Sequence, residues 1–367
     1  MTLMKRIIPS LRWLVPVVLV TGLVTSGAAV AAANAPTQGG SATLNGSGST
    51  FQQPFNEQVI GAFKQKNPNV TINYSGGGSG KGRQDFSDQV VDFAGTDAPY
   101  PAADAANVKG GTFLYFPTVA GPITVSYNLS GVKKLQLSPE TLAKIFQGDI
   151  KTWDDAAIKA DNPGVKLPST AITVVHRSDS SGTTQNFTGF LNAAAPGVWT
   201  LGSGSTVSWP ADQQAGQGNP GVGQTIKSTD GGVGYVDFSD AKALKLKFAS
   251  VKNKDGKFVA PSLKGTTAAV SKAQINQDLT YNPLNAAGAS AYPITSPTWI
   301  LAYEKYSDSA KATALKKFLN YIYGNGQKLA SSVDYAPLPT SLAGKAKAQV
   351  KLISGSSGSS SSSPPST

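Results

Sequence analysis

The chain has 367 residues, of which 40% are hydrophobic and 14% are charged, a composition typical of a folded globular protein of about two domains. It has no cysteine, which excludes a disulfide scaffold, a thiol nucleophile, a zinc–cysteine cluster, an iron–sulfur site and a lipid-anchored cysteine. Its single histidine disfavours most metal sites and Ser-His catalysis. The formal net charge of +11 favours anionic surroundings, but no Lys/Arg block and no basic stripe with interleaved aromatic residues is present, so no nucleic-acid partner is predicted.

Residues 1–35 have the pattern of an export signal. Lys5 and Arg6 precede an apolar stretch from Trp13 to Val24, and small residues with candidate cleavage sites follow at 31–35. The apolar stretch passes directly into an Ala-rich run instead of a charged stop, which favours a cleaved signal over a retained membrane anchor. No later segment approaches the ~20 apolar residues needed to span a bilayer.

Short Val-, Ile-, Phe- and Tyr-rich runs then alternate with helical patterns, which predicts an α/β protein with largely parallel sheets. One helix is predicted over 55–67, where apolar residues share one face. A second opens at Ser138, which can cap it, with Pro139 in the first position and an end before Gly148. A third spans about 309–323. The predicted strands are Val70 to Tyr74, Asp92 to Gly95, Ile123 to Tyr127, Ile172 to His176, Val233 to Phe238 and Trp299 to Tyr303.

Three turns rich in Gly, Ser and Thr each lie just before a helical pattern. They are residues 46–51 (GSGSTF), 75–82 (SGGGSGKG) and 177–183 (RSDSSGT). Such a turn presents free backbone N–H groups and the positive end of a helix dipole, and its hydroxyl groups add further donors. One turn alone is weak evidence, because ordinary capping turns have the same composition. Three in one chain, one of them with Arg177, together predict an oxyanion site.

Other motif explanations for these turns fail on spacing. In a nucleotide phosphate loop, Ser75 would occupy the first Gly position and Gly82 would replace the magnesium-binding hydroxyl. The glycines do not have dinucleotide-binding spacing with a suitable downstream acid, and no Gly-x-Ser-x-Gly nucleophile elbow exists. His176 suits a strand-end side chain better than a general base. No tight acidic cluster has ligand spacing, so no metal site is predicted.

The turns and further motifs together resemble the periplasmic or extracellular phosphate-binding protein of the high-affinity phosphate ABC transporter. This resemblance implies a two-lobed type II periplasmic-binding-protein fold, in which each lobe is a mixed sheet flanked by helices and two crossovers form a hinge. Mapped here, lobe one is about 41–122 plus 293–350, and lobe two is 123–292. The motifs that carry the likeness over nearly all of the body are residues 46–51, 74–80, 91–99, 116–118, 153–154, 177–183, 232–236, 293–296 and 334–339.

The resemblance also implies the phosphate contacts and their roles. Phe51 and Gly182 are expected to contribute backbone N–H groups. Arg177 would supply the one full positive charge, on a planar fork suited to two phosphate oxygens. Asp179 would orient Arg177 and partly offset its charge. The complete implied set of contacts is Thr50, Phe51, Ser79, Asp97, Arg177, Ser181, Gly182 and Thr183.

Asp97 is the informative member of this set, because an acceptor-only carboxylate repels an anion unless that anion still has a proton to donate. Hydrogen phosphate has one and sulfate does not. A site built around such a donor can reject an isostere that lacks it by as much as ~10⁴ to 10⁵-fold. Without the resemblance, Asp97 would be interpreted as a helix cap before Ala98 and Pro99.

The implied function is that of an exported, non-enzymatic and monomeric phosphate receptor, without cofactor or metal, that presents its closed complex to the membrane permease subunits of an ABC importer. It would be periplasmic, extracellular or associated with the cell wall. Alternatives are a receptor for sulfate, molybdate or tungstate, which Asp97 disfavours, and an extracellular phosphomonoester hydrolase, for which no nucleophile–base pair is found. Residues 354–367 are predicted to be a disordered tail or wall-spanning spacer, and this tail alone suggests an adhesin.

Overall fold

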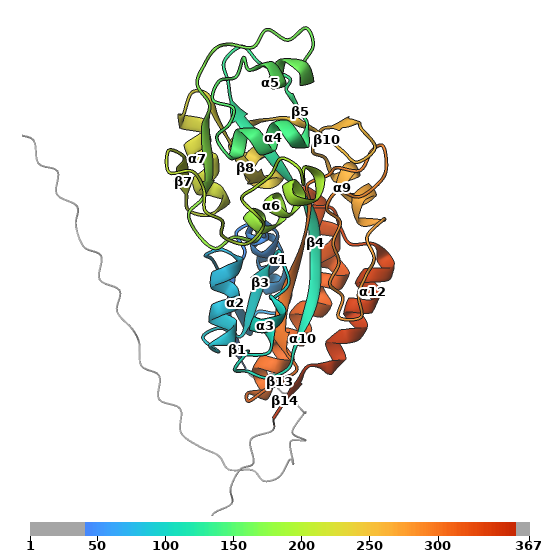
Figure 1. Ribbon diagram of the computed structural model, residues 1–367. Coiled ribbons are helices and arrows are strands. Elements are labelled where there is room, and N and C mark those ends of the chain that lie inside the picture. Colours follow the sequence, from blue (N-terminus) through green and yellow to red (C-terminus); the bar gives the residue numbers. More distant parts are fainter. Residues whose placement is uncertain (1–40, 357–367) are drawn as a thin grey trace, which may run out of the picture. The chain divides into compact units, whose positions relative to one another are not determined.

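A computed structural model describes residues 41–356, and one nine-stranded sheet runs through this part of the chain (Figure 1). The predicted export signal over 1–35 and residues 357–367 of the predicted tail lie outside the described residues. The strand order is β2-β1-β3-β12-β4-β8-β6-β7, with β9 beside β4. These nine strands are β1 (Ala42–Gly48), β2 (Val70–Gly76), β3 (Phe93–Thr96), β4 (Phe113–Asn128), β6 (Thr173–Arg177), β7 (Gln214–Gly216), β8 (Gly232–Asp237), β9 (Lys247–Phe248) and β12 (Thr295–Tyr303).

Helices flank this sheet, and two smaller sheets lie outside it. The small sheets contain β5 (Gln136–Leu137), β10 (Ser250–Lys252) and β11 (Phe258–Val259), and β13 (Lys305–Tyr306) with β14 (Ser354–Gly355). The helices are α1 (Gln53–Lys66), α2 (Ser79–Ser87), α3 (Ala102–Ala105), α4 (Pro139–Phe146), α5 (Ala156–Asp161), α6 (Gly182–Ala194), α7 (Gly218–Ser228), α8 (Phe238–Ala243), α9 (Leu263–Val270), α10 (Ser309–Tyr321), η1 (Ile322–Gly326), α11 (Gln327–Leu329), η2 (Ala330–Val333), α12 (Thr340–Gln349) and η3 (Val350–Leu352).

Strand β4 divides the sheet into two halves by changing its partner. Up to Pro122 it pairs antiparallel with β12, and from Ile123 onward it pairs antiparallel with β8. At the change, the backbone N–H of Ile123 donates to the carbonyl of Ile294, just before β12 begins at Thr295 (2.8 Å). We call β2, β1, β3, β12 and the first part of β4 the first half, and the rest of the sheet with its helices the second half.

Each half is a mixed sheet, as the resemblance implies, and the expectation of largely parallel sheets is only partly correct. β1 is parallel to β2 and β3, and β6 is parallel to β7 and β8, but β12 and β4 run antiparallel to their neighbours. Parallel pairs need a crossover connection. β4 runs from the first half into the second, and its neighbours β12 and β8 run in the opposite direction.

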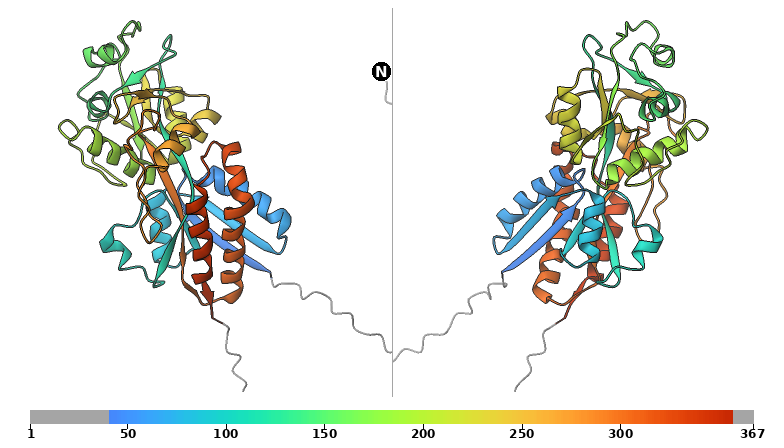
Figure 2. Two further views of the ribbon diagram at one scale, coloured as in Figure 1. Left: turned by 90° about the vertical axis from the view of Figure 1, so that its right-hand side faces the viewer. Right: turned by 60° about the vertical axis from the view of Figure 1, so that its left-hand side comes forward.

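The order of the strands places helices on both faces of each half. From β1 the chain steps outward through α1 to β2 and returns through α2 to β3, and right-handed crossovers in opposite directions put α1 and α2 on opposite faces. The same reasoning separates α6 from α7 around β6, β7 and β8, and Figure 2 shows these two helices on opposite sides of the sheet. Consistently, Val174 and Val175 of β6, which point to opposite faces, belong to separate apolar clusters.

All six predicted strands overlap observed strands, and the three best-marked helices are confirmed as α1, α4 and α10. The Ser138 hydroxyl caps α4 by accepting from the N–H of Thr141. Ser354 and Gly355, which fall inside the predicted tail, form β14 beside β13. The lobe boundaries stay a prediction. Within residues 41–356, no helix combines the length and the apolar character needed to cross a membrane.

Candidate anion-binding site

The three predicted turns, together with Asp97, lie where strands end and helices begin. The first turn joins β1 to α1, the second joins β2 to α2, and the third joins β6 to α6, while Asp97 directly follows β3. Because β1, β2 and β3 are parallel, their carboxyl ends share one edge of the first half, and the end of β6 lies at the corresponding edge of the second half. Parallel topology therefore collects these residues from distant parts of the sequence.

Glycines allow the turns of the two halves to touch. The N–H of Gly80 donates to the carbonyl of Ser180 (2.9 Å) across the two halves. A Cβ atom on Gly78, whose φ is +90°, would lie 2.2 Å from a carboxylate oxygen of Asp179. A Cβ atom on Gly182 would lie 2.4 Å from the hydroxyl oxygen of Ser79. Side chains at these glycines would keep the halves apart, so the structure shows a closed arrangement.

Every residue of the implied site is buried at this junction, and most of them are linked by short polar contacts. The Ser79 hydroxyl donates to Asp97 and also accepts from its backbone N–H (3.1 and 3.2 Å). The Ser181 hydroxyl caps α6 by accepting from the N–H of Thr184 (3.1 Å). The buried set is Thr50, Phe51, Ser79, Asp97, Arg177, Ser181, Gly182 and Thr183.

Arg177 and Asp179 form a buried ion pair at one end of the site. Nε of Arg177 donates to Oδ1 of Asp179 (2.8 Å), and Nη2 donates to Oδ2. Oδ1 also accepts from the N–H of Gly218 (3.0 Å). Burial alone would raise the pKa of Asp179, but the hydrogen bonds and charge of Arg177 hold it below its ordinary value. The third guanidinium nitrogen, Nη1, donates to the hydroxyl of Thr183 (3.3 Å).

At the other end of the site, Asp97 has hydroxyl partners and, among residues 41–356, no cation partner. Ser49 donates to Oδ1 (2.5 Å) and Ser79 donates to Oδ2 (3.1 Å). Burial raises the pKa of Asp97 to about 6, against the hydrogen bonds of the two serines and the charge of Arg177, which lower it. A carboxylate so deeply buried accepts any further donor that reaches it.

Sequence reasoning missed three residues that complete this junction, namely Ser49, Gly218 and Asn219. Ser49 lies inside the first predicted turn but was not singled out. Gly218 and Asn219 belong to a fourth Gly-rich turn, residues 216–221 (GQGNPG), which joins β7 to α7 just as the other turns join a strand to a helix. That shared pattern is the signal that could have found them.

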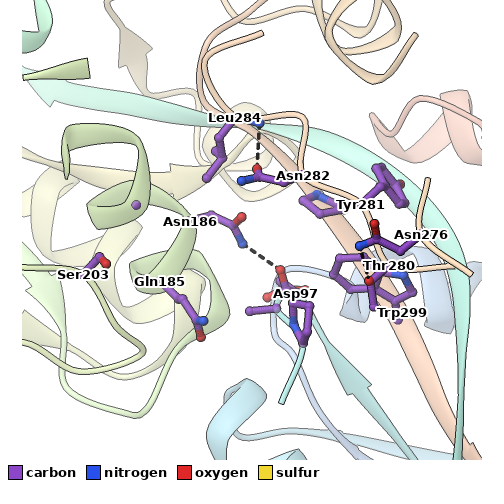
Figure 3. Close-up of a pocket in the computed structure, with 14 residues that line it drawn as sticks. Asp97, Gln185, Asn186, Ser203, Asn276, Thr280, Tyr281, Asn282, Leu284 and Trp299 are labelled. Atoms are coloured by element: carbon purple, nitrogen blue, oxygen red, sulfur yellow. Dashed lines mark hydrogen bonds between the residues drawn. The ribbon is translucent and has the colours of Figure 1, made fainter. Parts of the chain in front are cut away.

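A separate pocket of about 320 Å³ lies beside Asp97 (Figure 3). At its edge Nδ2 of Asn186 donates to the carbonyl oxygens of Asp97 and Gly182 (2.7 and 2.9 Å), and so links the two halves. Apart from Asp97, the side chains that line the pocket carry no charge. An oxyanion needs a cation or converging N–H donors, so the junction of the turns, and not this pocket, suits one.

The surroundings of His176 fit a packing role. The His176 ring stacks on Trp209 with 5.1 Å between ring centroids, and its Nδ1 contacts the carbonyl of Arg177, which supports the interpretation as a strand-end side chain. Burial lowers the pKa of His176. Within residues 41–356, no group of three or more His, Cys, Asp or Glu side chains could hold a metal ion.

Comparison with known proteins agrees with this geometry. A family model described as PBP superfamily domain matches residues 32–325. The chain is 36% identical over 313 residues to phosphate-binding protein PstS 3 of Mycobacterium leprae (strain TN), covering 83% of this chain and 85% of that protein. It is 38% identical over 340 residues to phosphate-binding protein PstS of Methanocaldococcus jannaschii, covering 86% of each.

A solved structure of a high affinity periplasmic phosphate-binding protein (PfluDING) bound with phosphate is 25% identical, with a TM-score of 0.70 over 84% of this chain and 94% of that one. This likeness extends over both halves of the sheet. The chain therefore belongs to the PBP superfamily and, within it, to the PstS phosphate-binding proteins.

Proposed function

We propose that the chain is an exported receptor that binds inorganic phosphate and delivers it to an ABC-type phosphate importer. The observation that carries this proposal is the pairing of two unlike ends in one buried junction. One end offers Arg177 and hydroxyl donors, and the other offers the carboxylate acceptor Asp97. Hydrogen phosphate is an anion that can both accept from the first end and donate to the second. The names of the PstS relatives support the same ligand.

The proposed ligands are the residues implied by the resemblance. The side chains of Thr50 and Arg177 would donate to phosphate oxygens, and Phe51 and Gly182 would donate through their backbone N–H groups. The Ser79 hydroxyl, which donates to Asp97 in this structure, would turn its proton to a phosphate oxygen. Ser181 and Thr183 at the start of α6 add hydroxyl donors where the positive end of the helix dipole favours an anion. Asp97 would accept the phosphate proton, and Asp179 would hold Arg177 in place.

Capture and release would follow from the opening and closing of the two halves. We propose lobes of 41–122 plus 293–350 and of 123–292, hinged where β4 changes its partner and just before β12. Opening would break the contact between Gly80 and Ser180 and expose the site. The closed form would dock on the permease subunits. The protein would act as a monomer without catalytic activity, in a periplasm or at the cell surface.

Calorimetric titration of phosphate, with sulfate as the control ligand, tests this function. The protein would lack residues 1–35 and would be unfolded, dialysed and refolded to remove bound anion. We expect tight one-to-one binding of phosphate, no heat with sulfate, and reduced discrimination in Asp97→Asn. Absence of phosphate heat would refute the proposal, equal binding of sulfate would favour a general oxyanion receptor, and release of phosphate from a monoester would favour a hydrolase.

A further inference from the structure

Asn219 is a fully buried amide that joins the two halves at the proposed site, although neither the motifs nor the implied phosphate contacts include it. It is the second residue of α7 and belongs to the second half. Its backbone N–H and its side-chain Nδ2 both donate to the hydroxyl oxygen of Thr50, in the first half (3.2 and 3.3 Å). Nδ2 also donates to the hydroxyl oxygen of Thr183 (3.2 Å).

These contacts use all the acceptor capacity of two proposed phosphate ligands. A threonine hydroxyl has two acceptor lone pairs and one proton to donate. Thr50 accepts twice from Asn219, and Thr183 accepts once from Asn219 and once from Nη1 of Arg177. Each hydroxyl therefore has only its proton left for a further partner.

We propose that Asn219 is a positioning residue that fixes the hydroxyl groups of Thr50 and Thr183 as hydrogen-bond donors toward the bound anion. The inference rests on the proposed function, because it needs an anion between these two threonines. It adds to the selectivity ascribed to Asp97: one end of the site can only donate, and the other end can only accept. A hydroxyl free to rotate would serve a donor ligand equally well, whereas a fixed one favours an acceptor.

The hydrogen bonds between Asn219 and Thr50 also depend on closure of the two halves. Thr50 and Asn219 lie on opposite halves, so their contact exists only while the halves are together. The backbone comes close enough because the residue before Asn219 is a glycine: Gly218 has a φ of +66°, and a Cβ atom there would lie 3.2 Å from Cγ2 of Thr50. Closure therefore completes the donor set of the first turn.

The test is a double-mutant cycle measured by phosphate titration of refolded protein. Asn219→Ala is made in the wild-type chain and in a chain that carries Thr50→Ala and Thr183→Ala. In the wild-type chain we expect the dissociation constant for phosphate to rise by about tenfold to a hundredfold, because two charge-assisted donors lose their orientation. In the chain without the hydroxyl groups, the same substitution should change it less than about threefold.

Two further variants separate binding from folding. Asn219→Asp keeps the size of the side chain and suits the first turn of a helix, yet its carboxylate would accept from both threonines and turn their protons away from the anion. We expect it to weaken phosphate binding more than Asn219→Ala does. Asn162→Ala is the matched control, since Asn162 is another buried amide of the second half, bonded to Gln136 and Ile158. It should lower the melting temperature and leave phosphate binding unchanged.

The outcomes distinguish this inference from the proposed function. If the wild-type chain does not bind phosphate, the proposed function itself fails. If the wild-type chain binds phosphate and Asn219→Ala binds equally well, only the positioning role is refuted. An equal penalty in the two backgrounds would also refute it, because Asn219 would then act independently of the threonine hydroxyls.

Discussion

Asp179 and Asp97 are two buried carboxylates at opposite ends of one junction, and their partners set them apart. Asp179 faces the Arg177 guanidinium, which holds its pKa below the ordinary value. Asp97 has the hydroxyl groups of Ser49 and Ser79, and burial raises its pKa to about 6. The same side chain thus acts as a counter-ion at one end and as an unpaired acceptor at the other. Both carboxylates are buried, so the difference between their pKa values comes from their partners: Asp179 has a cation beside it, and Asp97 has hydroxyl groups.

A substitution of Arg177 should have the largest effect on phosphate binding. Arg177→Met removes the cation and leaves Asp179 as a buried charge whose remaining contact is the N–H of Gly218. Truncating one partner of a buried, hydrogen-bonded charge pair between a protein and its ligand costs about 2–5 kcal/mol of binding free energy, so loss of the guanidinium from the anion should raise the dissociation constant for phosphate roughly a thousandfold. Calorimetric titration measures this change.

A second substitution separates the lost charge from lost stability. Adding Asp179→Asn to Arg177→Met removes the unpaired carboxylate, so the melting temperature should recover while phosphate binding stays weak. Lys159→Met, which breaks the exposed pair with Asp154 inside the second half, serves as the surface control and should leave binding unchanged. Tight phosphate binding by Arg177→Met would contradict the role given to this end.

The raised pKa of Asp97 should make the stability of the anion-free chain depend on pH as long as its two halves stay closed over this carboxylate. Its pKa is raised from 3.8 to about 6 in the folded chain, so between these values the folded chain binds more protons than the unfolded chain. The free energy of unfolding contributed by Asp97 therefore increases as the pH falls through about 6 and is complete below 3.8. The difference between these two pKa values corresponds to about 3 kcal/mol of unfolding free energy.

Denaturant unfolding of phosphate-free wild type and Asp97→Asn, at a series of pH values, measures this contribution. Other carboxylates titrate in both chains and cancel in the difference. The wild type should gain stability relative to Asp97→Asn as the pH is lowered across this range. Parallel pH profiles would show that Asp97 is not an unpaired buried carboxylate in the free protein.

The pattern of elements was predictable because it follows from local rules, such as the Ser138 cap of α4 and the strand–turn–helix units that carry the site. The partner change of β4 did not follow from local rules, because its apolar run has the same appearance whichever strand lies beside it; only the family resemblance suggested a lobe boundary between residues 122 and 123. Asn219 was missed for a related reason. It is 169 residues from Thr50, and the amide itself shows no chemistry in the sequence; only the Gly-rich turn around it marks the position before the fold brings it to the threonines.

A smaller effect on phosphate binding is expected from a substitution of Tyr335, which contacts the backbone of the first turn and belongs to neither end of the site. Its hydroxyl donates to the carbonyl of Phe51 and lies 3.4 Å from Oδ1 of Asp237, at the end of β8, so it links the first turn with the second half. Tyr335→Phe keeps the ring against Phe51 and removes both contacts. Since a net hydrogen bond is worth about 1 kcal/mol, the dissociation constant for phosphate should rise by roughly threefold to tenfold.

Tyr321→Phe, whose ring packs on Phe63 at 5.5 Å, is the matched control and should bind like wild type. If Tyr335→Phe also bound like wild type, the backbone of the first turn would be held by its own glycines and by α1, and phosphate binding would depend on other links between the halves, such as those of Asn186, Asn219 and Lys242.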